Sequence, residues 1–321
     1  MKKRVLTGIQ PSGKLHIGNY FGAIKRMVEY QDSSDLFLFV ANLHSLTSLK
    51  DGQKLKAMTQ EAVLDLLALG IDPEKSHFWI QSDVPEVTEL AWILSCLAPM
   101  GMMEKATSYK DKVAKGIKAN LGLFNYPVLQ AADILIHQAE GVPVGKDQKQ
   151  HLEMTRDLAT KFNAVYGETF VIPEPEIQES VAVVPGNDGQ KMSKSYNNFI
   201  PIFDEPKVIK KAVMSIVTDS KGVNEPKDPE TCNVFQIYKL FLDTQERVAL
   251  TERYRQGGMG YGEVKKMLLE VITDYFAPFQ EKRDYYAERP EVVKQLLKEG
   301  AEKVRCVSLE TMDKVRVAVG L

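Results

Sequence analysis

The chain has 321 residues, of which 44% are hydrophobic and 26% are charged, and its formal net charge is −2 with a pI near 6.3. This composition suits one large or two smaller folded domains with a sizeable core, and it excludes a disordered or collagen-like chain. It also argues against a strongly basic nucleic-acid binder, so any contact with RNA is expected from local patches.

Three cysteines, Cys96, Cys232 and Cys306, are too widely spaced for a disulfide framework or a CxxC metal pair. We therefore expect free thiols in a reducing compartment. The basic N-terminus is not followed by the apolar region of a signal peptide, and no apolar run reaches the roughly 18 residues that span a membrane. The sequence predicts a cytoplasmic protein without a membrane segment.

The first predicted strand, residues 2–6, is followed by a glycine-rich loop, TGIQPSGKLHIGNY (7–20), and an amphipathic helix over 20–31. Glycine lets a ligand approach the backbone closely. The helix directs its unpaired N–H groups and positive dipole end toward the loop, which suits a phosphate. The loop matches neither GxxxxGK[ST] nor GxGxxG, so a glycine-rich turn with a structural His16 is the alternative.

Short apolar runs then alternate with helical patterns. Residues 35–40 (DLFLFV) and 77–80 predict buried parallel strands, whereas 53–69 and 85–97 predict helices. This alternation predicts a Rossmann-like α/β fold with a doubly wound parallel sheet. His44 follows the strand 35–40 at the edge where ligands bind, so it is a site candidate; a hydrogen-bonded loop histidine is the alternative.

A helical insert is predicted around residues 98–140. Its first part, 98–103, is rich in methionine, which suits either the core or a subunit interface. The basic run 105–118 is either a solvated face or a mobile segment that binds polyphosphate or the acceptor stem. In the second case Lys110 and Lys112 would be its reaching residues.

A helix entered at Pro127 is predicted over residues 124–140. Tyr126, Gln130 and Asp133 share one of its faces, and apolar residues crowd the rest. Part of this polar face is therefore expected to be buried. A buried Asp133 must be paired or hydrogen-bonded.

Residues 142–150, VPVGKDQKQ, predict a strand end, a glycine turn and the start of a polar helix. Gly145 would let the backbone approach a nucleotide. Asp147 would accept from ribose hydroxyls, cap the helix, or do both. The histidine and glutamate that follow are not spaced as HExxH, so no protein-bound metal is expected.

A second loop motif, KMSKS at residues 191–195, follows a Pro/Gly/Asp turn. Its two lysines, Lys191 and Lys194, make a mobile cationic clamp for a polyphosphate. Beyond residue 203 strand patterns vanish, and helices are predicted over 205–217, 233–241, 245–254, 261–288 and 290–319. We therefore divide the chain into an α/β domain, 1–203, and an all-helical domain, 204–321.

The HIGN turn and the KMSKS loop together resemble the class I aminoacyl-tRNA synthetases. The fuller stretches GIQPSGKLHIGNY, YPVLQAADIL and VPVGKDQKQHLEMTRDLA are similar to the tryptophanyl-tRNA synthetases in particular. This resemblance implies a tryptophan–tRNA ligase that uses ATP to activate L-tryptophan as tryptophanyl-adenylate and then transfers it to tRNA(Trp). It covers most of residues 1–200 and is weaker beyond Phe203.

The resemblance also implies roles for individual residues. The catalytic groups, which would stabilise the transition state and neutralise the leaving pyrophosphate, are His16, Lys110, Lys112, Lys191 and Lys194. The implied ATP contacts are Gln10, Pro11, Ser12, Gly18, Asn19, Gly145, Lys146, Asp147, Val184, Lys191, Met192, Ser193, Lys194 and Ser195. The implied tryptophan contacts are Leu6, Gln10, His44, Tyr126, Gln130, Asp133 and Gln148. Asp133 would accept the indole N–H.

The family further implies Mg²⁺, which would be held mainly by the ATP phosphates because no dedicated carboxylate cage is visible. A homodimer with contacts in the insert and anticodon recognition by the helical domain are also implied. Three positions depart from relatives. Asn19 replaces a second histidine, as in the tryptophan branch, while Leu6 and Gln130 stand where an aromatic residue and methionine are common and leave the details of the pocket open.

Three rival hypotheses fit parts of the sequence. A tyrosyl-tRNA synthetase shares both motifs, but the GIQPSG form and the lack of a recognisable RNA-binding tail domain argue against it. A non-catalytic paralogue is disfavoured by the intact His16, Lys191 and Lys194. A small-molecule adenylyltransferase would not need the long helical half.

Overall fold

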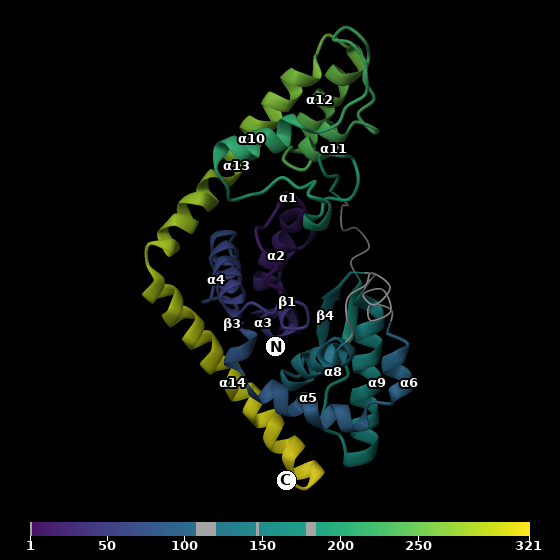
Figure 1. The fold of residues 1–321 in the computed structure, drawn as a ribbon, viewed down its shortest axis with the longest axis vertical. Helices are drawn as coiled ribbons and strands as arrows, with labels where there is room; N and C mark the ends of the chain where they lie inside the picture. The colour runs from purple at the N-terminus through teal and green to yellow at the C-terminus, as the bar shows by residue number, and fades with distance from the viewer. Residues whose placement is uncertain (1, 107–119, 146–147, 178–183) are drawn as a thin grey trace.

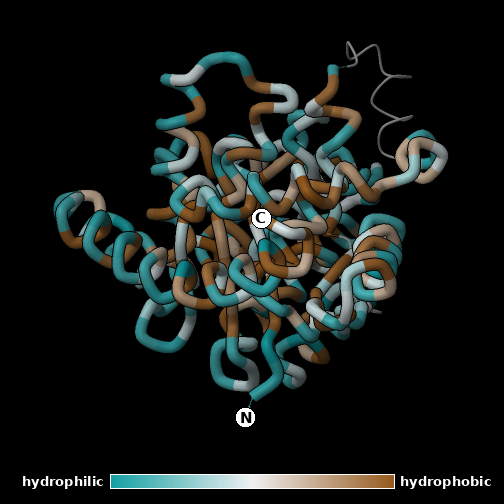
Figure 2. The backbone as a smooth tube through the Cα atoms, turned by 90° about the horizontal axis from the view of Figure 1, so that it is seen from below, coloured by the Kyte–Doolittle hydropathy of each residue, from teal (hydrophilic) through white to brown (hydrophobic). Residues whose placement is uncertain are grey.

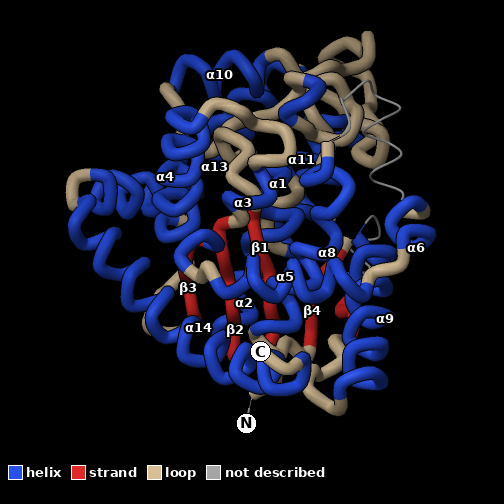
Figure 3. The backbone as a smooth tube through the Cα atoms, turned by 60° about the horizontal axis from the view of Figure 1, so that its bottom comes forward, coloured by secondary structure: helices blue, strands red, loops and turns tan. Residues whose placement is uncertain are grey.

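The computed structural model describes residues 2–106, 120–145, 148–177 and 184–321. Its centre is a five-stranded parallel sheet with the order β3-β2-β1-β4-β5. The strands are β1 (Arg4–Ile9), β2 (Asp35–Val40), β3 (His77–Ile80), β4 (Gly141–Val144) and β5 (Glu174–Ile177). The order runs outward from β1 in both directions, so the predicted doubly wound sheet is confirmed, with its switch point between β1 and β4 (Figure 3).

Helices cover both faces of this sheet. They are α1 (Ile17–Asn19), a π-helical turn (Tyr20–Ile24), α2 (Lys25–Ser33), α3 (Asn42–Ser45), α4 (Gly52–Ala68), α5 (Glu86–Leu97), α6 (Met100–Glu104), α8 (Leu121–Ile136) and α9 (Lys149–Tyr166). Along β2, Leu36 and Leu38 pack in one core with α4, whereas Phe37 and Phe39 pack in a second core with α5, α8 and α9. A strand buried on both faces needs apolar residues at every position, as in DLFLFV.

The sequence analysis missed one strand and placed the start of two helices wrongly. Strand β5 was not predicted, because Glu174-Pro175-Glu176 lacks the apolar pattern of a buried strand; it forms the sheet edge, where proline and charge are tolerated. The first helical segment begins at Ile17 rather than residue 20. Helix α8 begins at Leu121 with Asn120 as its N-cap, so Pro127 lies inside the helix rather than at its start.

The second half of the chain contains the five predicted helices, and residues 203–321, all described, include no strand. They are α10 (Pro206–Met214), α11 (Asn233–Tyr238), α12 (Thr244–Gln256), α13 (Tyr261–Ala287) and α14 (Pro290–Val319). In Figure 1, α10, α11 and α12 gather at the top, while α13 and α14 follow one another along one side down to the sheet. The described helices include none that is long and apolar enough to cross a membrane.

Helix α14 returns to the α/β half and forms part of its core. Val304, Met312 and Val315 are fully buried in the same cluster as α5 and α8. Gly300 lies directly against strand β3, where a Cβ would overlap the carbonyl group of Phe78. In Figure 2 the hydrophobic segments lie mostly toward the middle of the molecule, and the loops at its rim are mostly hydrophilic.

The packing of α14 on β3 predicts a large effect of a single methyl group. Gly300→Ala should lower the free energy of unfolding by about 1–3 kcal/mol, because the added Cβ meets backbone that cannot turn away. Gly262→Ala is the matched control: it lies in α13 with nothing within 4 Å of its Cβ position, and alanine there should be neutral or slightly stabilising. Equal melting temperatures for the two variants would contradict this packing.

Candidate functional site

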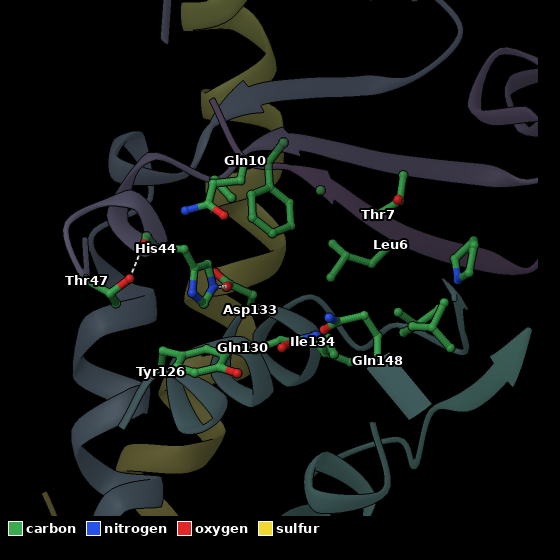
Figure 4. Close-up of a pocket in the computed structure, with 16 residues that line it drawn as sticks. Leu6, Thr7, Gln10, His44, Thr47, Tyr126, Gln130, Asp133, Ile134 and Gln148 are labelled. Atoms are coloured by element: carbon green, nitrogen blue, oxygen red, sulfur yellow. Dashed lines mark hydrogen bonds and ion pairs between the residues drawn. The ribbon is translucent and has the colours of Figure 1, made fainter. Parts of the chain in front are cut away.

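A cavity of about 480 Å³ opens at the carboxyl ends of β1 and β4, at the switch point of the sheet. Its walls come from β1, β2, β4, α3 and α8 (Figure 4). All seven residues predicted to contact tryptophan line it: Leu6, Gln10, His44, Tyr126, Gln130, Asp133 and Gln148. The structure thus brings together residues that are far apart in the sequence.

The carboxylate of Asp133 is the polar centre of this cavity, and it is only 2% exposed. Gln81 Nε2 donates to both of its oxygens at 2.9 and 2.8 Å, and His44 Nε2 lies 2.9 Å from Oδ2. The Gln81 carbonyl accepts from the backbone N–H of Leu43 at 3.0 Å, so its amide nitrogen must face Asp133. A carboxylate has about four acceptor positions, so Asp133 retains capacity for one more donor.

Gln81 was not predicted as a site residue. It lies in a 3₁₀ turn, Gln81–Asp83, directly after β3, and is 1% exposed. Its position at the carboxyl end of a predicted strand was the available signal. Its partners on α3 and α8 are set by the fold and not by local sequence.

His151 is a second residue that sequence reasoning missed. It is 2% exposed, its Nδ1 lies 2.9 Å from Gln148 Oε1, and its Nε2 lies 3.0 Å from the hydroxyl of Tyr126. His151 thereby holds two residues of the cavity wall in place.

His16 caps the first helix. Its Nδ1 accepts from the backbone N–H of Asn19 at 3.2 Å, and Asn19 Oδ1 accepts from the His16 N–H at 3.1 Å. Burial, together with the positive charge of nearby Lys194, lowers the pKa of His16 to about 4. The imidazole is therefore neutral near pH 7, with its proton on Nε2 as a possible hydrogen-bond donor.

The KMSKS loop lies on the glycine-rich loop. Lys194 Nζ donates to Ser12 Oγ at 3.1 Å and to the carbonyl of Gly13 at 2.8 Å. Burial lowers the pKa of Lys194 to about 8, and the carboxylate of Asp65 acts in the opposite direction. Gly18 donates to Met192 Sδ at 3.4 Å, and a Cβ on Gly18 would lie within 3.0–3.3 Å of His16 and Met192.

The backbone also joins the two motifs. Ile17 donates to the Ile200 carbonyl, and Ile202 donates to the Leu15 carbonyl, both at 3.1 Å. Glycine-rich loop and KMSKS loop therefore form one unit beside the cavity, although they lie at opposite ends of the α/β half of the sequence.

The remaining predicted ATP contacts are distributed as follows. Pro11, Ser12, Gly18, Asn19, Lys191, Met192, Ser193, Lys194 and Ser195 belong to the two joined loops. The Gly145 carbonyl accepts from the Gln148 N–H at 3.0 Å, and the Val184 carbonyl accepts from the Met192 N–H at 2.9 Å. Lys110, Lys112, Lys146 and Asp147 lie outside the described residues. Within the described ranges no group of three His, Cys, Asp or Glu side chains is arranged to hold a metal ion.

Behind Asp133, the fully buried His137 hydrogen-bonds through Nδ1 to the Asp133 carbonyl at 2.6 Å. Burial lowers the pKa of His137 from 6.5 to about 4. The unfolded chain therefore takes up a proton at a pH where the folded chain does not, and stability is lost as the pH falls below 6.5 toward 4.

The contribution of His137 to the free energy of unfolding should be nearly level above pH 6.5 and should fall by on the order of 3 kcal/mol at pH 4. In His137→Asn this part of the slope should be missing, although the variant is less stable at pH 7. Denaturant titrations across this pH range measure both. An unchanged slope in the variant would show that His137 titrates normally.

The sequence of this chain is similar to those of known proteins over most of its length. The family model described as tRNA synthetases class I (W and Y) matches residues 1–277. A tryptophan–tRNA ligase of Campylobacter jejuni (strain RM1221) is 55% identical over 318 residues, covering 99% of this chain and 100% of that protein. One from Fusobacterium nucleatum is 54% identical over 320 residues, covering 99% and 98%.

A solved structure shows the same fold. The tryptophanyl-tRNA synthetase from Campylobacter jejuni complexed with ADP and tryptophan superposes with a TM-score of 0.96 at 55% identity, covering 99% of this chain and 100% of that one. The tryptophanyl-tRNA synthetase from Mycoplasma pneumoniae superposes with a TM-score of 0.82 at 32% identity, covering 100% and 98%.

Proposed function

Because the chain belongs to the class I tRNA synthetases for tryptophan and tyrosine, we infer that it is a tryptophan–tRNA ligase. In this proposal the cavity binds tryptophan, and the two joined loops bind the ATP that activates it. A carboxylate oxygen of tryptophan attacks the α-phosphorus of ATP, and the bond to the β-phosphate bridging oxygen breaks. Pyrophosphate leaves. A ribose hydroxyl of the tRNA terminal adenosine then attacks the acyl carbon and releases AMP.

The observation that carries the substrate assignment is the buried carboxylate of Asp133. An indole N–H only donates, and a carboxylate with one acceptor position left is its complement. Gln81 and His44 hold Asp133 in a fixed orientation from two directions. The apolar side chains of Leu6 and Phe39 in the same cavity would contact the faces of the ring.

The joined loops are the proposed site of ATP. Adenylate formation needs positioning and charge neutralisation more than a covalent nucleophile. The neutral His16 would donate from Nε2 to a phosphate oxygen. Lys194 would exchange Ser12 and Gly13 for oxygens of the leaving pyrophosphate, and Lys191, whose side chain is exposed, would act beside it.

Mg²⁺ would enter with ATP and be bound mainly by its phosphates. The roles of Lys110, Lys112, Lys146 and Asp147 are proposed on sequence alone. The helical half would receive the anticodon of tRNA(Trp). The exposed thiols of Cys96 and Cys306 suit a reducing cytoplasm, where we place the protein.

A homodimer is supported by apolar side chains at the surface of the insert and its neighbour. Trp92 on α5 is 72% exposed and Leu121 on α8 is 84% exposed. Leu121 lines the same surface groove as Ala91, the residue next to Trp92. Large exposed apolar side chains on two helices that pack together, α5 and α8, suit an interface between subunits.

Asp133→Asn tests substrate recognition, because the amide keeps the shape and loses the charge. The Michaelis constant for tryptophan should rise roughly 10- to 100-fold in tryptophan-dependent pyrophosphate exchange, and discrimination against phenylalanine should shrink. A variant that melts earlier while its selectivity is unchanged would show that Asp133 serves only the fold.

Lys194→Ala tests the clamp. The kcat for pyrophosphate exchange should fall by about 10²–10³, with the Michaelis constant for tryptophan nearly constant, because the ammonium acts on charge that develops in the transition state. Lys75→Ala, which removes an exposed lysine paired with Asp32, should behave like the wild type. Weaker tryptophan binding by calorimetry in the Lys194 variant would argue against this role.

A further inference from the structure

The side chain of Asn198 hydrogen-bonds to the backbone of the KMSKS loop at two residues. It is 2% exposed, although it follows an exposed polar stretch. Its Oδ1 accepts from the backbone N–H of Ser193 at 2.8 Å. Its Nδ2 donates to Asp188 Oδ1 at 2.7 Å and to the Lys191 carbonyl at 3.1 Å. One amide thus makes two contacts with the loop and one with the turn that precedes it.

The orientation of this amide is fixed by its partners. A backbone N–H can only donate and a backbone carbonyl can only accept, so Ser193 must face the oxygen and Lys191 the nitrogen. The Asn198 carbonyl also accepts from the Asn187 N–H at 2.9 Å. Across the turn Gly186 leaves room for the amide, because a Cβ there would overlap it.

The contact with Ser193 reaches the lysine directly. Ser193 is the N-cap of the 3₁₀ turn Lys194–Tyr196, and its hydroxyl accepts from the Ser195 N–H at 3.2 Å. Holding the Ser193 N–H therefore holds the start of the turn that carries Lys194. The contact with the carbonyl of Lys191 fixes the other lysine at its own backbone.

We propose that Asn198 is a positioning residue for adenylate formation, which sets the backbone from which Lys191 and Lys194 reach the leaving pyrophosphate. This inference rests on the proposed function. Asn198 itself touches no substrate. A displacement of about 1 Å in groups that act on the transition state costs on the order of 10² in rate, so loosening this amide should lower kcat and leave tryptophan binding intact.

Placing a carboxylate at residue 198, alone or in exchange with that of Asp188, tests this role. Asn198→Asp keeps the acceptor for Ser193, removes both donors, and places a carboxylate against that of Asp188, which repels it. Its kcat in tryptophan-dependent pyrophosphate exchange should fall about 10- to 100-fold with the Michaelis constant for tryptophan unchanged. The double variant Asp188→Asn, Asn198→Asp restores this pair with donor and acceptor exchanged, but it does not restore the donor to the Lys191 carbonyl, so its kcat should recover part of the loss.

Two further variants complete the experiment. Asp188→Ala, at an exposed position, removes one of the three contacts together with the hydrogen bond from the Gln190 N–H to the same oxygen, and it should lower kcat by less than Asn198→Asp does, in a fully folded protein. Asn197→Gly is the matched control: it deletes the neighbouring exposed amide, and glycine accepts the left-handed backbone there, with φ of +52°. It should retain the wild-type kcat.

The outcomes distinguish a failure of the proposed function from a failure of the positioning role of Asn198. A wild type that shows no tryptophan-dependent exchange would refute the proposed function itself. With an active wild type, the positioning role is overturned by any one of three results: Asn198→Asp folded with an unchanged kcat, a swap no better than the single variant, or Asp188→Ala equal to wild type. A purely structural role predicts lower melting temperatures with kcat per folded molecule constant.

Discussion

The buried carboxylate of Asp133 is the group on which the arrangement of this site depends. A charge removed from water must be hydrogen-bonded, and here Asp133 and its two partners come from three segments that are separate in the sequence. Asp133 is on α8, Gln81 follows β3, and His44 is on α3 after β2. The strand order of the parallel sheet, with its switch point between β1 and β4, brings these three segments to one cavity. The fold therefore supplies a preorganised acceptor before any substrate arrives.

A second constraint is the distribution of positive charge beside this cavity. Lys194 is partly buried and donates to a hydroxyl and a carbonyl, and His16 stays neutral, so the Lys194 ammonium is held by dipoles and not by an acid. Asp65, which lies on α4, raises the pKa of Lys194 but is itself paired with Arg283 of α13 at 2.7 Å. Because the Asp65 carboxylate is already paired with Arg283 of the helical half, it does not hold Lys194 in an ion pair, and Lys194 remains available for a phosphate.

Much of this could be predicted from sequence, for physical reasons that differ by element. Buried parallel strands such as DLFLFV and capped amphipathic helices are determined locally, whereas the edge strand Glu174–Ile177 has no local signal. The two motif loops and seven residues that line the cavity were predicted from residue patterns and family resemblance. Gln81, His151 and Asn198 were not, because each is an ordinary polar residue whose importance arises from burial against partners distant in sequence or across a turn.

Recognition of the indole N–H by Asp133 is tested most directly by comparing tryptophan with its benzothiophene analogue, in which sulfur replaces the indole N–H with little change of shape. A cavity built around a donor should reject a substrate that lacks it, so kcat/KM for pyrophosphate exchange by the wild-type enzyme should fall by about 10³–10⁴. Equal activation of the two amino acids would show that the Asp133 carboxylate does not accept from the indole N–H and that the cavity does not select tryptophan through it.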